Sequence, residues 1–278
     1  MIATRSVKSK SLPSLLRKLH EDPEQMAAFL LERSGLPGPR ANLELAWTFA
    51  DGAKEFNKTV GWKEQMMQWA SISPAAAPTN HPQEYLPFVA IQALAELHPE
   101  ENASGRRLIE SMLRQAANDP RWRMREGCAF GLQRIAMNDI QELKSILQHW
   151  LEQPSLLEHR AALVALAHPP LLTNKDTVSF AFGIGDAALQ ACLSDPRDKE
   201  AHRVLRKALE FAPSVFVAAD PDRGFPWLER WADKGTLQVA KIVAANLRKA
   251  RLSRKFPDRV QDVAMRLEAC DYSEMPCE

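Results

Sequence analysis

The apolar residues of this chain recur every three or four positions, the spacing that builds one face of an α-helix. The pattern is clearest at Met124, Cys128 and Leu132. Asp119-Pro120 comes just before them, and this pair is a helix-start signal because Asp can cap a helix and Pro suits its first position. Glycine and alanine lie between the large residues, so we expect a neighbouring helix to pack closely here.

The same periodicity predicts helices along the whole chain and no strand, because no stretch alternates apolar and polar residues. Three interruptions are expected: a Pro- and Ala-bearing loop at 71–80, a helix break at 183–185 and an irregular Pro- and Gly-containing region at 213–226. The predicted helices cover residues 12–20, 24–33, 40–56, 61–69, 85–97, 105–117, 122–136, 140–151, 156–167, 176–194, 195–211, 227–233, 236–251 and 258–270.

A leucine that closes the second helix of each predicted pair recurs at spacings of 38, 34, 43 and 38 residues. The fragments 124–132 and 239–247 align without a gap. A helix pair that returns about every 40 residues indicates units that bury their apolar faces only against their neighbours. The recurring leucines are Leu94, Leu132, Leu166, Leu209 and Leu247, and a weaker copy closes on Phe49.

The fullest copy reads Asp119-Pro120, then Met124-Arg125, Cys128-Ala129 and Leu132. This order of Asp-Pro, an apolar residue, Arg, and then Ala and Leu at helical intervals resembles the HEAT repeats of the armadillo-like superfamily. The resemblance covers about residues 37–251, and the patterns of tetratricopeptide and ankyrin repeats are not present.

The resemblance implies an all-α fold, a right-handed HEAT-like α-α superhelix of about 6 helix pairs. We therefore expect one helical repeat domain over residues 12–271. A disordered tail at 1–11 and a short C-terminal tail at 272–278 would flank it.

Composition narrows the class of protein. An apolar fraction of 45% excludes a disordered chain, and a formal net charge of +1 is weak evidence against a dedicated nucleic-acid binder. No apolar run is long enough to cross a bilayer, and the N-terminus has no signal-peptide region. Four cysteines are too few for a disulfide scaffold, and Cys128 and Cys192 lie in apolar helical patterns. We expect a soluble, reduced, cytoplasmic protein that does not bind membranes.

Motifs for metals, nucleotides or a nucleophile are not found, so no metal and no cofactor are expected. The histidines form no His-Glu-x-x-His motif, and His149 and His159, which could approach across a helical hairpin, are interpreted as surface residues. The 183–186 segment is not a dinucleotide loop because no strand precedes it. Trp227 and Trp231, four positions apart, favour a place in the core over a ligand box.

Basic residues gather on the predicted second helices, which line the concave face of a HEAT array. A basic groove could accept a phosphate backbone, an acidic peptide or an acidic helix. For Arg125 the alternative is a structural ladder, because in HEAT proteins the Arg after the apolar residue often pairs with an Asp of the next repeat. The basic residues on these helices include Arg134, Arg160 and Lys207. Those expected at the binding groove are Arg121, Arg123, Arg125, Arg203, Arg206, Lys241 and Arg248.

One aromatic–acidic pair points to chemistry. Trp47 and Asp51 lie one helical turn apart and therefore share a helix face. The armadillo-like superfamily includes HEAT-like alkylpurine DNA glycosylases, which use Trp and Asp at this spacing with an Arg and another Trp nearby. The resemblance implies that Asp51 stabilises the cationic sugar, that Trp47 and Trp122 contact the sugar or the lesion, and that Arg125 contacts a phosphate. The alternative is core packing for Trp47 and a capping or solvent role for Asp51.

We expect a non-catalytic scaffold that binds a protein or peptide in its concave groove, because the repeat pattern brings no convergent catalytic set. The alternative is a protein that binds DNA or repairs alkylated DNA. Whether the chain is an enzyme stays open, and its chemistry would then be that of an alkylbase DNA glycosylase.

Overall fold

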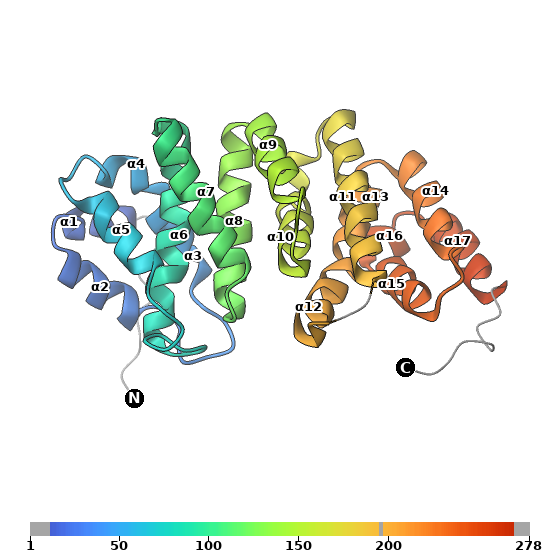
Figure 1. Ribbon diagram of the computed structural model, residues 1–278, viewed down its shortest axis with the longest axis horizontal. Helices are drawn as coiled ribbons and strands as arrows, with labels where there is room; N and C mark the ends of the chain where they lie inside the picture. Colours follow the sequence, from blue (N-terminus) through green and yellow to red (C-terminus); the bar gives the residue numbers. More distant parts are fainter. Residues whose placement is uncertain (1–11, 195–196, 270–278) are drawn as a thin grey trace. The chain divides into compact units, whose positions relative to one another are not determined.

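The computed structural model describes residues 12–194 and 197–269, and within them the chain is all-α, with no strand (Figure 1). This confirms the predicted fold class. The tails expected at 1–11 and 272–278, and the start of the helix expected at 195–211, lie outside these residues. The chain forms two compact units, 1–146 and 147–278, and the single domain expected over 12–271 stays a prediction. The HEAT assignment, the superhelix and its handedness stay predictions.

The helices of the first unit pack around one central helix. Predicted and observed helices agree closely, and the 71–80 segment is a loop as expected. The helices of the first unit are α1 (Leu12–Leu19), α2 (Pro23–Glu32), α3 (Leu43–Asp51), α4 (Ala53–Phe56), α5 (Trp62–Ala70), η2 (Pro82–Glu84), α6 (Tyr85–Leu97), η3 (His98–Glu100), α7 (Ala103–Ala117), α8 (Trp122–Asn138) and the first part of α9 (Ile140–Trp150).

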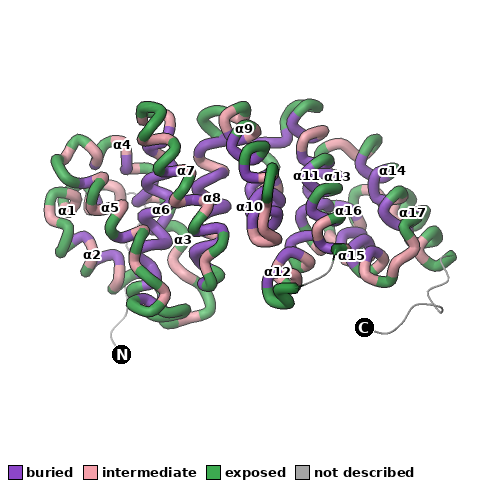
Figure 2. The backbone as a smooth tube through the Cα atoms, viewed as in Figure 1, coloured by how far each residue is buried: buried purple, intermediate pink, exposed green. Residues whose placement is uncertain are grey.

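Helix α6 forms the core of the first unit. It contacts α3, α5, α7 and α8, and it is buried along nearly its whole length (Figure 2). A helix that is apolar on all sides needs neighbours on all sides, which is how YLPFVAIQALAEL specifies this central position. Pro87 falls in its first turn, where a missing N–H does least harm.

Two glycines let α8 pack closely against the core, as the sequence predicts. A Cβ atom added at Gly127 would lie 3.0 Å from Cγ2 of Ile91. One added at Gly131 would lie 3.0 Å from Cβ of Ala95 and 2.7 Å from a methyl of Leu113. Both separations are shorter than ordinary van der Waals contact, so the missing side chains set the distance between α8 and its neighbours.

Local capping explains most helix boundaries. The Asn42 side chain accepts a hydrogen bond from the Leu45 amide, and Asn102 accepts from two amides at the start of α7. The helix expected over 40–56 is wrong in one respect, because it divides at Gly52 into α3 and α4. A Cβ atom at Gly52 would meet the Phe56 ring, so this turn requires glycine.

The second unit has its own core. At the start of α10, Ser155 and Glu158 form a capping box. The helices of this unit are the end of α9, then α10 (Leu156–Leu166), η4 (Pro169–Leu171), α11 (Lys175–Leu193), α12 (Lys199–Leu209), α13 (Ala212–Ala219), α14 (Pro221–Ala232), α15 (Leu237–Leu247), α16 (Ala250–Ser253) and α17 (Pro257–Ala269).

Two sequence predictions fail in the second unit. The break expected at 183–185 is absent, because α11 runs unbroken from Lys175 to Leu193. The region expected to be irregular at 213–226 is helical, and forms α13 and the first half of α14. The prolines explain the second error: Pro213 and Pro221 lie in the first turns of α13 and α14, where proline is tolerated.

Gly185 in α11 has a packing role instead. A Cβ atom at this position would lie 2.6 Å from Cζ2 of Trp227. Trp227 and Trp231 are each 1% exposed, which confirms their predicted place in the core. The Nε1 groups of both tryptophans donate hydrogen bonds to Oδ1 of Asp186, at 2.8 and 2.7 Å. The glycine and the aspartate therefore fit α11 to the two indoles of α14.

Candidate functional site

Three helices of the first unit present matching rows of side chains. α3 contributes Leu43, Trp47 and Asp51, and α8 contributes residues 122, 126, 130 and 134, each row spaced by four positions. The α6 row of residues 88, 92 and 96 lies against both, since α6 contacts α3 and α8. A spacing of four places each row along one helix face. The α3 and α8 rows therefore lie on either side of the α6 row, whose Phe88 and Gln92 are buried beneath them.

Side-chain contacts pair these rows from end to end. The Trp47 and Phe130 rings meet edge to face with centroids 6.1 Å apart, and Phe130 also meets Phe88 of α6 at 6.3 Å. One turn further, Nη1 of Arg134 lies 2.7 Å from Oδ1 of Asp51. Because the contacts progress along α3 and α8 in the same order, these two helices run in the same direction.

Large apolar side chains stay exposed on this surface. Leu43 is 39% exposed, Trp47 45% and Trp122 42%. We call these three residues and Phe130 the aromatic face. Exposed apolar groups gathered in one place typically mark a binding surface, whereas scattered ones do not.

A hollow of about 400 Å³ opens on the aromatic face. Its floor includes Phe88, which is buried, and Trp122 stands at its side with the Arg123 guanidinium 4.3 Å from the indole centroid. Apolar walls with a few polar groups at the rim are typical of sites that take a ligand or an anchoring side chain. The lining residues are Pro39, Arg40, Ala41, Leu43, Phe88, Trp122, Arg123, Glu126 and Phe130.

The far end of the surface is polar. Besides Asp51, the Arg134 guanidinium contacts Oε2 of Glu96 at 3.1 Å and donates to the Trp47 carbonyl at 3.1 Å. The Arg134 side chain is 15% exposed, whereas the Asp51 carboxylate is 69% exposed. Arg134 therefore holds the exposed carboxylate in place beside Trp47.

The structure brings Trp47, Asp51 and Trp122 onto this one surface. Core packing, the alternative for Trp47, is wrong, because nearly half of its surface is exposed. Asp51 lies in solvent but pairs with Arg134, a partner that the sequence did not indicate. The signal that could have found Leu43 and Phe130, and paired Arg134 with Asp51, is the spacing of four shared by the α3 and α8 rows.

Arg121, Arg123 and Arg125, expected at a basic groove, are buried in the first unit. Arg121 pairs with Asp119 at 2.7 Å, and Arg123 pairs with Glu84 at 2.9 Å. Arg125 donates to the carbonyls of Asp119 and Pro120 at 2.8 and 3.0 Å, just before its own helix. These contacts give the three arginines a structural role at the start of α8. The pairing of Arg125 with an Asp of the next repeat stays a prediction beside these backbone contacts.

The other predicted groove residues belong to the second unit. Arg203 pairs with Glu200 on its own helix at 2.6 Å, and Arg206 approaches Glu210 at 3.9 Å. Lys241 and Arg248 are exposed on α15 and just after it. Exposed ion pairs such as that of Arg203 add little stability. Arg203, Lys241 and Arg248 are exposed to solvent.

The second unit contains a cysteine beside a histidine and two further histidines that the sequence singles out. Cys192 lies 3.6 Å from Nε2 of His202, but burial raises the pKa of its thiol to about 11, so it stays protonated near neutral pH. The expectation of a surface position holds for His149 and is wrong for His159, which is buried in α10. Burial lowers the pKa of His159, which favours a neutral imidazole.

Comparisons with known proteins leave the function open. No family model, no curated protein and no solved structure matches the chain. Among the described residues, no helix has both the length and the apolar character needed to cross a bilayer.

Proposed function

We propose that this protein is a non-catalytic helical scaffold that binds a protein or peptide on the aromatic face of its first unit. The observation that carries the proposal is the 400 Å³ hollow lined by the exposed Leu43 and Trp122 side chains, together with the exposed Trp47 ring, which contacts Phe130 of the same lining. Interfaces concentrate their binding energy in aromatic residues around a desolvated pocket. An apolar or aromatic side chain of the partner would enter the hollow beside Trp122.

Rim charges suggest how the partner is oriented. Arg40 and Glu126 line the same hollow, so a partner with mixed polar groups around one apolar anchor is complementary to it. Asp51 is held outward by Arg134 at the polar end and can accept hydrogen bonds from a donor on the partner. Such polar contacts give specificity and register more than affinity.

A displayed random-peptide library selected on the purified protein tests this function. We expect enriched peptides to share an apolar or aromatic anchor, and Trp122→Ala to weaken their binding about 30-fold, as expected for loss of a central aromatic residue worth about 2 kcal/mol. Leu108→Ala is the matched control, because Leu108 is 49% exposed on α7, outside the aromatic face. Peptides that bind wild type and Trp122→Ala equally would remove the aromatic face as the binding site.

DNA repair is the second candidate function, because Trp47, Asp51 and Trp122 share one surface. The carboxylate would act on a cationic sugar, and the indoles would contact the sugar or the lesion. The burial of Arg121, Arg123 and Arg125 weighs against a phosphate-binding role for these three guanidiniums. This is why the scaffold function is preferred.

Duplex DNA titrated at low and moderate salt decides between the two functions. Phosphate contacts make affinity fall steeply as salt rises. The scaffold function predicts no such binding and no base released from alkylated duplex. Salt-sensitive binding together with base release that Asp51→Asn abolishes would replace the scaffold by a glycosylase.

A further inference from the structure

Away from the aromatic face, the first unit gathers one histidine and two glutamates from three elements. His98 is the first residue of η3, Glu110 lies within α7 and Glu142 lies in the first turn of α9. One potential ligand atom from each of the three residues lies within 4.8 Å of the others. No metal motif in the sequence predicts this cluster, because its members are separated by 12 and 32 positions.

The histidine is fixed and aimed at both carboxylates. The His98 side chain is 1% exposed, and its Nε2 atom lies 2.9 Å from Oε1 of Glu110 and 3.8 Å from Oε1 of Glu142. Ligands of a metal ion at bonds of about 2.1 Å are separated from one another by about 3 to 3.5 Å. The two His98 separations are close to this range, so small side-chain rotations would bring all three donors onto one ion.

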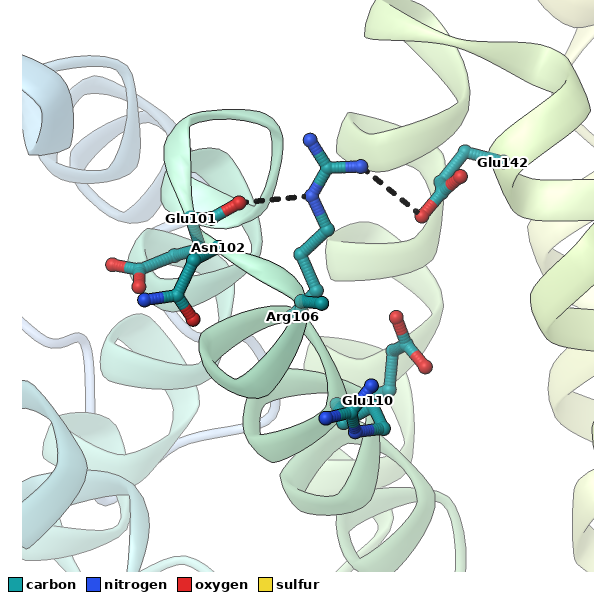
Figure 3. A pocket seen from close by; sticks show the side chains of 7 residues that line it. Glu101, Asn102, Arg106, Glu110 and Glu142 are labelled. Atoms are coloured by element: carbon teal, nitrogen blue, oxygen red, sulfur yellow. Dashed lines mark hydrogen bonds and ion pairs between the residues drawn. The ribbon is translucent and has the colours of Figure 1, made fainter.

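The carboxylates are reachable from solvent while the histidine is not. Glu110 and Glu142 line a hollow of about 490 Å³, and Figure 3 shows the Arg106 guanidinium turned toward Glu142. Their side chains are 23% and 31% exposed. The hollow provides an entry path for an ion and room for water molecules to complete its coordination.

Arg107 lines the same hollow as the two glutamates, and so does Arg106, which also contacts one of them. Nη1 of Arg106 lies 3.8 Å from Oε1 of Glu142, a loose ion pair. Its Nε and Nη2 atoms donate to the carbonyls of Glu101 and Pro99 at 3.0 and 3.2 Å, so the backbone holds it to one side.

We propose that His98, Glu110 and Glu142 bind a divalent transition-metal ion. One imidazole nitrogen with two carboxylate oxygens is a donor set that suits Zn²⁺, Mn²⁺ or Co²⁺, whereas Ca²⁺ and Mg²⁺ prefer oxygen ligands alone. On binding, the ion replaces the contact between Nε2 of His98 and Glu110. Nε2 must then present its lone pair, so any proton it carries moves to Nδ1 or to solvent.

Bound metal would join α7 to α9 at the end of α6. The ion therefore acts as a cross-link within the first unit and stabilises it by preferential binding to the folded state. Because none of these residues belongs to the aromatic face, this proposal stands apart from the binding function above.

The test uses the full chain, free of affinity tag and treated with chelator, titrated with Co²⁺ and Zn²⁺. We expect one equivalent of Co²⁺ to produce visible d–d absorption, Zn²⁺ to displace it, and excess Mg²⁺ or Ca²⁺ to leave it unchanged. At saturating Zn²⁺ the thermal midpoint should rise by about 5 °C. Glu110→Gln and Glu142→Gln should each weaken Co²⁺ binding at least about tenfold.

The matched control is Glu152→Gln, because Glu152 lies 3.7 Å from His149 in an exposed pair without a second carboxylate. This variant should bind Co²⁺ as wild type does. The two glutamate variants are checked by circular dichroism, and since both residues reach solvent they should fold. Failure of wild type to produce the Co²⁺ spectrum, or equal affinity in wild type and both glutamate variants, would overturn the proposal.

Discussion

Each unit combines tryptophan and aspartate side chains, and the two units use them in opposite ways. In the first unit, Trp47 is half exposed and Asp51 of the same helix pairs with an arginine. In the second, Trp227 and Trp231 are fully buried and donate to Asp186 of a different helix. The difference lies in the residue on the opposing helix. Gly185 of α11 leaves room for the Trp227 indole, whereas the Phe130 ring of α8 occupies the space beside Trp47.

The contrast teaches that helical spacing determines which residues share a face but not what lies opposite. A buried aromatic cluster with satisfied N–H groups stabilises the fold. An exposed one leaves surface for a partner. Stability should therefore depend on the second unit's tryptophans, and binding on those of the first.

The largest effect should come from truncating the buried indole. Trp227→Ala should lower the free energy of unfolding by about 3–5 kcal/mol, because it opens a cavity and removes ring contacts with Phe182 at 4.8 Å and Trp231 at 4.3 Å. Trp47→Ala should cost about 1 kcal/mol or less. Guanidinium unfolding followed by circular dichroism measures both. Equal losses would show that burial does not distinguish the two tryptophans.

A smaller effect should follow from filling the space at Gly185. Gly185→Ala should destabilise by about 1–3 kcal/mol, because its Cβ would lie 2.6 Å from the Trp227 ring. Gly183→Ala is the matched control on the same helix, where an added Cβ meets nothing within 4 Å. That change should stabilise by up to about 1 kcal/mol through helix propensity. Thermal unfolding of the two variants gives the comparison, and a stabilising Gly185→Ala would contradict the packing argument.

Most helices of the fold can be predicted from the sequence. The spacing of apolar residues predicts α6, α8 and α10 to within about two residues of their observed bounds. These helices are largely buried, so their sequences carry many apolar residues at helical spacing. The predictions for 183–185 and 213–226 are wrong for one reason, because they treat glycine and proline as helix breakers. Gly185 instead makes room for Trp227, and Pro213 and Pro221 start helices.

The candidate site was predicted less completely. Trp47, Asp51 and Trp122 were chosen from residue type and spacing, and they share a surface. Arg134 was not assigned to Asp51, because the two are 83 positions apart and meet only when α3, α6 and α8 align. The same distance problem hid Glu84 from Arg123 and both glutamates from His98. The positive charge of Arg121 and Arg123 predicts a basic groove, but both arginines form buried ion pairs at the start of α8.

The smallest effect separates the two carboxylates. Asp186→Ala should cost about 1 kcal/mol, because it removes the acceptor of two indole N–H groups while water still reaches this exposed position. Asp51→Ala should cost less than about 0.5 kcal/mol, because its carboxylate is 69% exposed and the Arg134 guanidinium keeps Glu96 and the Trp47 carbonyl as partners. Asp186→Asn retains an acceptor oxygen and should recover most of the loss, which a purely electrostatic role for Asp186 would not allow. Chemical denaturation at 0.1 and 1 M salt completes the comparison, since the Asp51 contribution should vanish at high salt whereas that of Asp186 should persist.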